Sequence, residues 1–226
     1  MTFPTTNATQ ELPAINEILA SVGQAPVNTL DQTNPDVAIA YDTLTRVSRE
    51  IQAEGWNFNT EEYLEVALNA NEQTISGVTT NTEYEIPNNV LQCDLHAEDD
   101  NQYESVWRVK VDDTEKKPRL YEKINHTFDW YTLTNKSTLN VDVVYFYDWV
   151  ELPKVVQDYV VARAATIVSS RIVGDSTQYR MLAEKELYNR AQALEYECRQ
   201  GDYTFFGHQR GKKPYDSYQP YQALYR

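Results

Sequence analysis

The sequence predicts an α+β fold: a bundle of about four helices, two N-terminal and two C-terminal, with an inserted antiparallel β lobe and an irregular C-terminal tail. Apolar residues recur every three or four positions near both ends of the chain, whereas short runs rich in Val, Ile, Tyr and Thr fill the middle. The chain has 226 residues, of which 41% are hydrophobic, so it can form a packed core. We therefore expect a helical bundle made of residues 1–55 and 151–200, a β domain at 56–150 and a tail at 201–226.

The first helix is expected over residues 12–22, where the apolar side chains share one helix face. Pro13 fits its first turn, because the N–H that proline lacks would have no partner there. Gly23 is a natural residue just after the helix end, and Pro26 prevents the helix from continuing. The apolar positions are Leu12, Ile15, Ile18, Leu19 and Val22.

The second helix has clearer boundaries. Asn34 is a suitable N-cap and Pro35 a suitable first residue, while Gly55 ends the pattern. This helix is expected to meet the other helices in one bundle, because its apolar residues follow at intervals of four, three, three and four positions. They are Val37, Tyr41, Leu44, Val47 and Ile51.

Five segments of the middle region have the composition of β-strands. Loops rich in Asn, Asp and Pro separate them, and residues 76–89 and 97–102 are expected to be exposed turns. Parallel strands would need crossover helices here, so the strands are expected to pair antiparallel, as meanders or a small sandwich. The predicted strands are 61–68, 89–97, 103–111, 119–124 and 139–147.

A third helix is expected to begin at Pro153 and to end at Gly174. Its sequence, VVQDYVVARAATIVSSRIVG, is apolar around much of the helix circumference. A helix of this kind is predicted to be buried on several sides.

A fourth helix is expected over residues 177–199. Ion pairs of Glu186 with Arg190 and of Glu195 with Arg199 would lie on its solvent side. Its expected apolar face consists of Tyr179, Leu182, Leu187, Leu194 and Cys198.

The C-terminal tail has neither a helical nor a strand period. It carries four basic residues and two acidic ones, a net charge of +2 on an otherwise acidic chain. Such a segment cannot form its own core, which leaves three alternatives: a strap folded on its own domain, a docking segment for a partner, or a disordered end. The favoured interpretation is a docking segment anchored by Tyr203, Tyr215, Tyr218, Tyr221, Leu224 and Tyr225.

Composition and motifs argue against several classes of protein. The formal net charge of -14 disfavours binding to nucleic acid phosphates. Glycine-rich phosphate loops, zinc-ligand spacings and nucleophile motifs are absent, so no catalytic residue, cofactor or metal site is predicted. Cys93 and Cys198 are expected to be reduced and mostly buried, although a disulfide is an open alternative. The N-terminus lacks the pattern of a signal peptide, and no apolar run approaches the roughly 20 residues that span a bilayer.

Three blocks, in this order, resemble the tail tubular protein A family of short-tailed podovirus phages. The first is INEILASVGQAPVNTL (15–30) followed by IQAEGWNFNTEE (51–62). The second is RLYEKINHTFDW (119–130) leading into VDVVYFYDWVELP (141–153), and the third is YVVARAATIVSSRIVGD (159–175). Together they extend over nearly the whole chain.

The resemblance implies a structural virion protein and not an enzyme. It implies a dodecameric adaptor, or gatekeeper, ring that is assembled in the host bacterial cytoplasm. The ring would dock on the portal protein, join it to the tail nozzle (tubular protein B), support the N-terminus of the tail fibre and conduct DNA through its channel without binding it specifically. An acidic channel wall would repel DNA phosphates, and aromatic-rich edges suit head-to-tail contacts between subunits.

Two alternatives belong to other classes. One is a tail-associated glycan hydrolase, because a pair of the 34 acidic residues could flank a glycosidic bond, although the sequence marks no such pair. The other is an unrelated soluble binding module that uses its tail to recognise a peptide.

Overall fold

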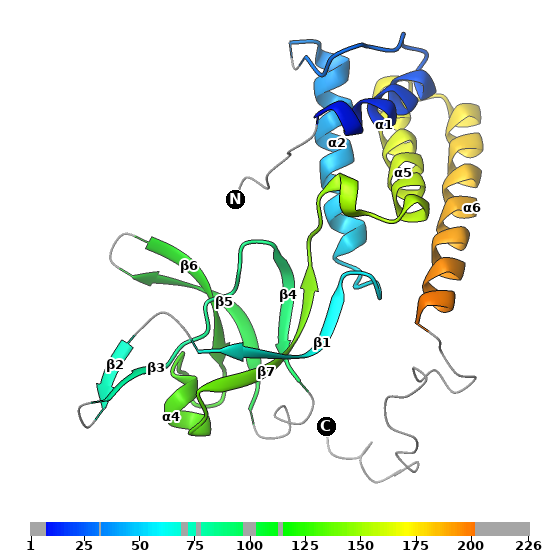
Figure 1. Cartoon of the computed structure of the whole chain (residues 1–226). Helices are drawn as coiled ribbons and strands as arrows, with labels where there is room; N and C mark the ends of the chain where they lie inside the picture. Colours follow the sequence, from blue (N-terminus) through cyan, green and yellow to red (C-terminus); the bar gives the residue numbers. More distant parts are fainter. Residues whose placement is uncertain are drawn as a thin grey trace.

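The α+β prediction is confirmed by the computed structural model, which describes residues 8–31, 33–68, 72–75, 78–96, 103–112 and 115–201 (Figure 1). Four helices lie together at one end of the molecule, and the strands lie at the other. The helices are α1 (Ala8–Ser21), α2 (Pro35–Gln52), α5 (Lys154–Ile172) and α6 (Ser176–Gln200). The tail predicted at 201–226 and the turn predicted at 97–102 lie outside the described residues, apart from Gly201.

Helix α1 begins one turn earlier than predicted, so Pro13 lies inside the helix and not in its first turn. The end of the helix is as expected, with Gly23 in the left-handed region at φ 79°. The side chain of Asn16 then fixes the following loop. Its Oδ1 accepts the N–H of Val27 at 2.8 Å, and its Nδ2 donates to the Val27 carbonyl at 3.0 Å.

The predicted boundaries of α2 are confirmed. The Asn34 side chain accepts the N–H of Asp36 at 3.1 Å, and Pro35 is the first helical residue. Gly55 follows the helix with φ 76°, a conformation that strains other residues.

Helix α5 lies at the centre of the bundle, where it packs against α1, α2 and α6. Burial on several sides is confirmed, because its buried residues occur all around the helix. Its N-cap is Pro153, and Gly174 follows its end with φ 69°. The fully buried apolar side chains of the bundle come from all four helices and include Ile15, Ile18, Val47, Ile51, Tyr159, Val160, Val168 and Ala193.

The strands pair antiparallel, as predicted, in one three-stranded sheet and two hairpins. The sheet has the order β1 (Thr60–Ala67), β7 (Thr138–Tyr145), β4 (Val90–Leu95). The hairpins are β2 (Glu72–Ile75) with β3 (Val78–Asn81), and β5 (Ser105–Asp112) with β6 (Glu115–Glu122). Two short helices, α4 (Trp130–Thr134) and η1 (Trp149–Glu151), were not predicted.

The prediction of an exposed turn at 76–89 is confirmed for residues 87–89 and wrong for residues 78–86. The β2–β3 hairpin ends at Asn81, and Tyr84 and Ile86 then enter the core of the β lobe. Backbone bonds hold them there, since the Ile86 N–H donates to the Pro118 carbonyl at 2.9 Å. The acidic side chain of Glu83 is buried because it pairs with Arg119, whereas sequence composition alone indicated solvent exposure.

Two buried amides join the bundle to the three-stranded sheet. The Gln52 side chain donates to the Tyr147 carbonyl at 3.1 Å and accepts the Tyr147 N–H at 2.8 Å. Asn59 donates to the Gln52 carbonyl at 2.9 Å and to the Tyr145 carbonyl at 2.8 Å. These bonds satisfy backbone groups at the end of α2 and the end of β7 together, so they fix how the two regions meet.

Candidate interaction surface on helix α6

Helix α6 forms one side of the bundle, and most of its surface is in contact with solvent. Ala193 is its one buried residue. Met181, Leu187 and Tyr188 are 69%, 67% and 63% exposed. The predicted apolar face is therefore largely exposed to solvent, since Leu182 alone of its five residues is half-buried.

The exposed apolar residues of α6 share one side of the helix. Leu187, Ala191, Leu194 and Cys198 follow at intervals of four, three and four, which aligns them in a stripe. Met181 and Tyr188, seven residues apart, lie beside this stripe. These six residues are called the outer α6 face, and helical geometry places them opposite the buried Ala193.

Polar contacts hold α6 to the rest of the chain. The Gln178 amide donates to the Ser21 carbonyl, and Lys185 pairs with Glu17 of α1 at 2.7 Å. Asn189 donates to the Asp158 carbonyl at 3.1 Å, and Glu197 accepts the Asn57 N–H at 2.8 Å. The helix is thus positioned without using its outer face.

The ion pairs of α6 differ in part from the prediction. The pair of Glu195 with Arg199 forms. Glu186, however, pairs with Arg163 of α5 at 3.5 Å, and Arg190 pairs with Glu54, just after α2, at 3.9 Å. Both side chains reach across to other elements, and these pairs replace the predicted bond along the helix.

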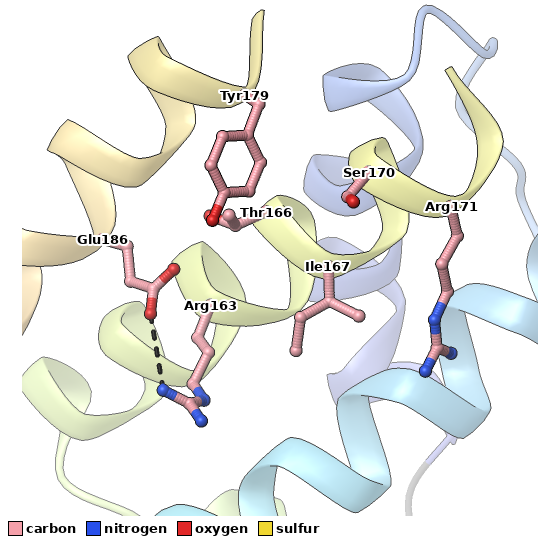
Figure 2. A pocket seen from close by; sticks show the side chains of 7 residues that line it. All are labelled: Arg163, Thr166, Ile167, Ser170, Arg171, Tyr179 and Glu186. Atoms are coloured by element: carbon pink, nitrogen blue, oxygen red, sulfur yellow. Dashed lines mark hydrogen bonds and ion pairs between the residues drawn. The ribbon is translucent and has the colours of Figure 1, made fainter. Parts of the chain in front are cut away.

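A pocket of about 320 Å³ lies between α5 and α6 (Figure 2). At its lower end Arg163 extends toward Glu186, and the same guanidinium lies 3.7 Å from Glu50 of α2. Glu186 is the one carboxylate of the lining, and it is already paired with Arg163. These two side chains link α5 to α6, and the lining holds no unpaired carboxylate for acid–base chemistry. The lining residues are Arg163, Thr166, Ile167, Ser170, Arg171, Tyr179 and Glu186.

Two carboxyl groups at the bundle have a raised pKa. Burial raises the pKa of Glu11, opposed by a hydrogen bond from Tyr41, and burial raises the pKa of Glu197, opposed by the Asn57 N–H. Each carboxyl contacts another segment of the chain. Packing between elements of the chain therefore explains both raised pKa values.

The two cysteines are free thiols in different surroundings. Cys93 is buried in the β lobe, and burial raises its pKa to about 12. Cys198 is exposed on α6, contrary to the expectation that both are mostly buried. Within the described ranges there is no group of three or more His, Cys, Asp or Glu side chains placed to hold a metal ion. Among the described helices, none is long and apolar enough to cross a membrane.

The predicted anchors of the tail, Tyr203, Tyr215, Tyr218, Tyr221, Leu224 and Tyr225, all lie outside the described residues. Sequence reasoning identified Leu187, Leu194 and Cys198 as apolar positions of one helix face but did not predict that they are exposed. The signal was present, because an apolar stripe of helical period followed Leu187. What the period does not reveal is whether such a stripe packs on its own chain or on another molecule.

The family model described as Tube, tail tubular protein, matches residues 12–203. This range includes α2, α5 and α6 and all the strands between them. No curated protein matches the chain.

Proposed function

We propose that this chain, which belongs to the tail tubular protein family of phages, is the subunit of the head-to-tail adaptor ring. Membership of the family makes the chain a structural component of the virion tail. The proposal adds a dodecameric ring that docks on the portal, joins it to the nozzle, supports the fibre and conducts DNA. A structural family favours this role over a glycan hydrolase or an unrelated binding module.

The outer α6 face is the observation that best supports the proposal. Met181, Leu187 and Tyr188 are three large apolar side chains exposed on one helix, and groups of exposed apolar side chains mark protein interfaces. A ring requires every subunit to present such a surface to its neighbour. The net charge of -14 is compatible with a channel that repels DNA phosphates.

In this proposal the parts of the chain have separate tasks. Residues 1–55 and 151–200 form the helical body of the ring, and residues 56–150 form a β domain that faces the nozzle or fibre. Residues 201–226 dock on the portal through their tyrosines. A fully buried aromatic anchor contributes about 2 kcal/mol or more, so the loss of several is measurable.

The test is co-sedimentation with the purified portal ring of the same phage. Full-length chain is compared with residues 1–200, which retain all of α6. Binding by the full-length chain alone supports the adaptor and the docking tail. Equal binding by both supports the adaptor and removes the tail from portal docking, and binding by neither overturns the adaptor proposal.

A second set of variants separates the tail from other exposed tyrosines. Replacing Tyr215, Tyr218 and Tyr221 together with Ala should weaken portal binding by tenfold or more. The matched control is Tyr63→Ala, which removes a half-exposed tyrosine of β1 and should leave portal binding unchanged.

A further inference from the structure

We infer that the first half of the outer α6 face of one copy, with Met181, Leu187 and Tyr188, packs against the solvent-facing side of α2 of the next copy, with the two helices parallel. The inference rests on the proposed ring and names the two surfaces that close it. Each copy would then contribute α6 on one side and α2 on the other. Such a head-to-tail contact forms a closed ring when the rotation between copies is constant.

The arrangement of the bundle places these two helices on opposite sides. Helix α5 packs against both α2 and α6, which lie to either side of it (Figure 1). Both helices run in the same direction, antiparallel to α5. A neighbouring copy related by rotation about an axis along the bundle would therefore bring its α2 beside α6 in parallel orientation.

The solvent-facing side of α2 has the character of a partner surface. Its buried residues lie on the opposite side of the helix, while Ile39, Asp42, Arg46 and Arg49 are exposed at intervals of three, four and three. These four residues are called the outer α2 face. Its long arginine stems can cover apolar surface while their charged groups stay in water.

Charges on the two faces match when the helices run in parallel. Along α6, Arg180 precedes Glu184 by four residues, and along α2, Asp42 precedes Arg46 by four. Parallel alignment therefore pairs Arg180 with Asp42 and Glu184 with Arg46, opposite charges in both cases, with Arg46 shared with Glu50 of its own helix, 3.9 Å away. Within the described part of the chain, neither Arg180 nor Asp42 forms an ion pair.

The same alignment gives the first part of the apolar stripe a partner, whereas Ala191, Leu194 and Cys198 come level with positions beyond Gln52, the last residue of α2. Seven positions beyond the first charge pair, Leu187 comes level with Arg49, and Tyr188 lies beside it. An arginine can stack on a tyrosine ring and pack its stem on leucine.

The first test counts the copies bound to each portal ring by native mass spectrometry, with less chain than the ring can hold. The full-length wild type should fill some rings completely and leave others empty, because each bound copy helps the next. Leu187→Glu should give partly filled rings instead. Ile124→Glu places the same charge on an exposed apolar residue of the β lobe and should fill rings as the wild type does.

A charge reversal tests the pairing itself. Arg180→Asp and Asp42→Arg should each weaken ring filling by about tenfold, since each places like charges opposite one another. The double variant restores opposite charges and should recover filling close to the wild type. Recovery is expected for the parallel pairing alone, so single reversals without effect, or a double variant no better than either, overturn the inference.

The remaining outcomes separate this inference from the proposed function. Wild-type chain that does not bind the portal ends the adaptor proposal, and the α6 contact is then judged by sedimentation of the free chain, where a monomer at high concentration overturns it. The inference is wrong if Leu187→Glu leaves ring filling unchanged and Cys198 reacts faster with a thiol reagent. Such a result would assign residues 202–226 of the same chain as the cover of α6.

Discussion

Helices α5 and α6 are consecutive in the chain and packed together, yet they are held in opposite ways. Ten of the 19 residues of α5 are buried, against one of 25 in α6. Apolar side chains on several sides fix α5, whereas amides and ion pairs fix α6 at its ends and along one side. The apolar surface of α5 is thus buried in the core, whereas much of the apolar surface of α6 stays exposed, which is the surface that the proposed assembly would use.

The largest effect is expected from a charge in α5. Val160 is fully buried in the bundle core, and Val160→Asp would place a carboxylate there without a partner. We expect a loss of about 4 kcal/mol or more in the free energy of unfolding. Urea denaturation followed by circular dichroism measures it.

The matched change on α6 is Leu187→Glu, which also puts a carboxylate in place of an aliphatic residue. Because Leu187 faces solvent, the free energy of unfolding should stay within about 0.5 kcal/mol of the wild type. Equal losses for Val160→Asp and Leu187→Glu would show that the two helices are not held differently.

The next largest effect is expected where α6 meets the core. Ala193 is fully buried and belongs to the same cluster as the residues of α5. Ala193→Leu adds volume to a packed contact, which typically costs about 1–3 kcal/mol. Thermal unfolding measures this loss, and Ala191→Leu on the outer α6 face is the control that should cost little. A stabilised Ala193→Leu would mean that α6 is loosely packed at this point.

The sequence predicted α5 better than α6, and the reason is physical. A helix that is apolar all around can hide its surface in one way, by burial on several sides. An amphipathic helix such as α6 has one apolar stripe, and its period is the same whether the partner is the same chain or another. The caps at Asn34 and Gly23 were also predictable, because local chemistry decides them.

What sequence reasoning missed in the β lobe depended on contacts distant in the chain. Residues 82–86 are polar enough to indicate a turn, but Arg119 pairs with Glu83, and β6 accepts and donates backbone bonds to this segment. Likewise Gln52 is buried because the backbone of Tyr147, far along the chain, satisfies its amide. Neither partner can be identified from local composition.

A smaller effect is expected from the ion pairs that bridge the helices. Arg163 is about one-third exposed and lies between Glu50 of α2 and Glu186 of α6. Arg163→Ala should cost about 1 kcal/mol and less in high salt, because partly exposed pairs are screened. Lys154→Ala removes an exposed i,i+4 pair with Asp158 and should cost less. A loss that does not change with salt would assign the effect of Arg163 to packing of its stem.

The smallest effect on the free energy of unfolding is expected from Glu197, and this effect should depend on pH. Burial raises the pKa of this carboxyl above 4.5, although the Asn57 N–H opposes the shift. The folded chain therefore holds the proton more tightly than the unfolded chain, and the wild type gains stability as the pH falls from 7 toward 4.5. Glu197→Gln keeps a carbonyl oxygen that accepts the Asn57 N–H, but it has no carboxyl to protonate and cannot gain this stability at low pH. Its free energy of unfolding, relative to the wild type, should fall over this range.

Glu122 of the β lobe provides the opposite sign in the same experiment. Burial opposes its ionisation, but the backbone N–H groups of Asn125, Ile124 and Glu104 outweigh burial and hold its pKa below 4.5. The stability that this carboxylate supplies is complete above pH 4.5 and is lost as the pH falls through its lower folded pKa. Glu122→Gln should thus recover toward the wild type below pH 4.5, whereas Glu197→Gln changes above it. Denaturant titrations at several pH values distinguish the two variants. If the free energy of unfolding depended on pH in the same way for both, the carboxyl of Glu197 would not be one of the contacts that position α6.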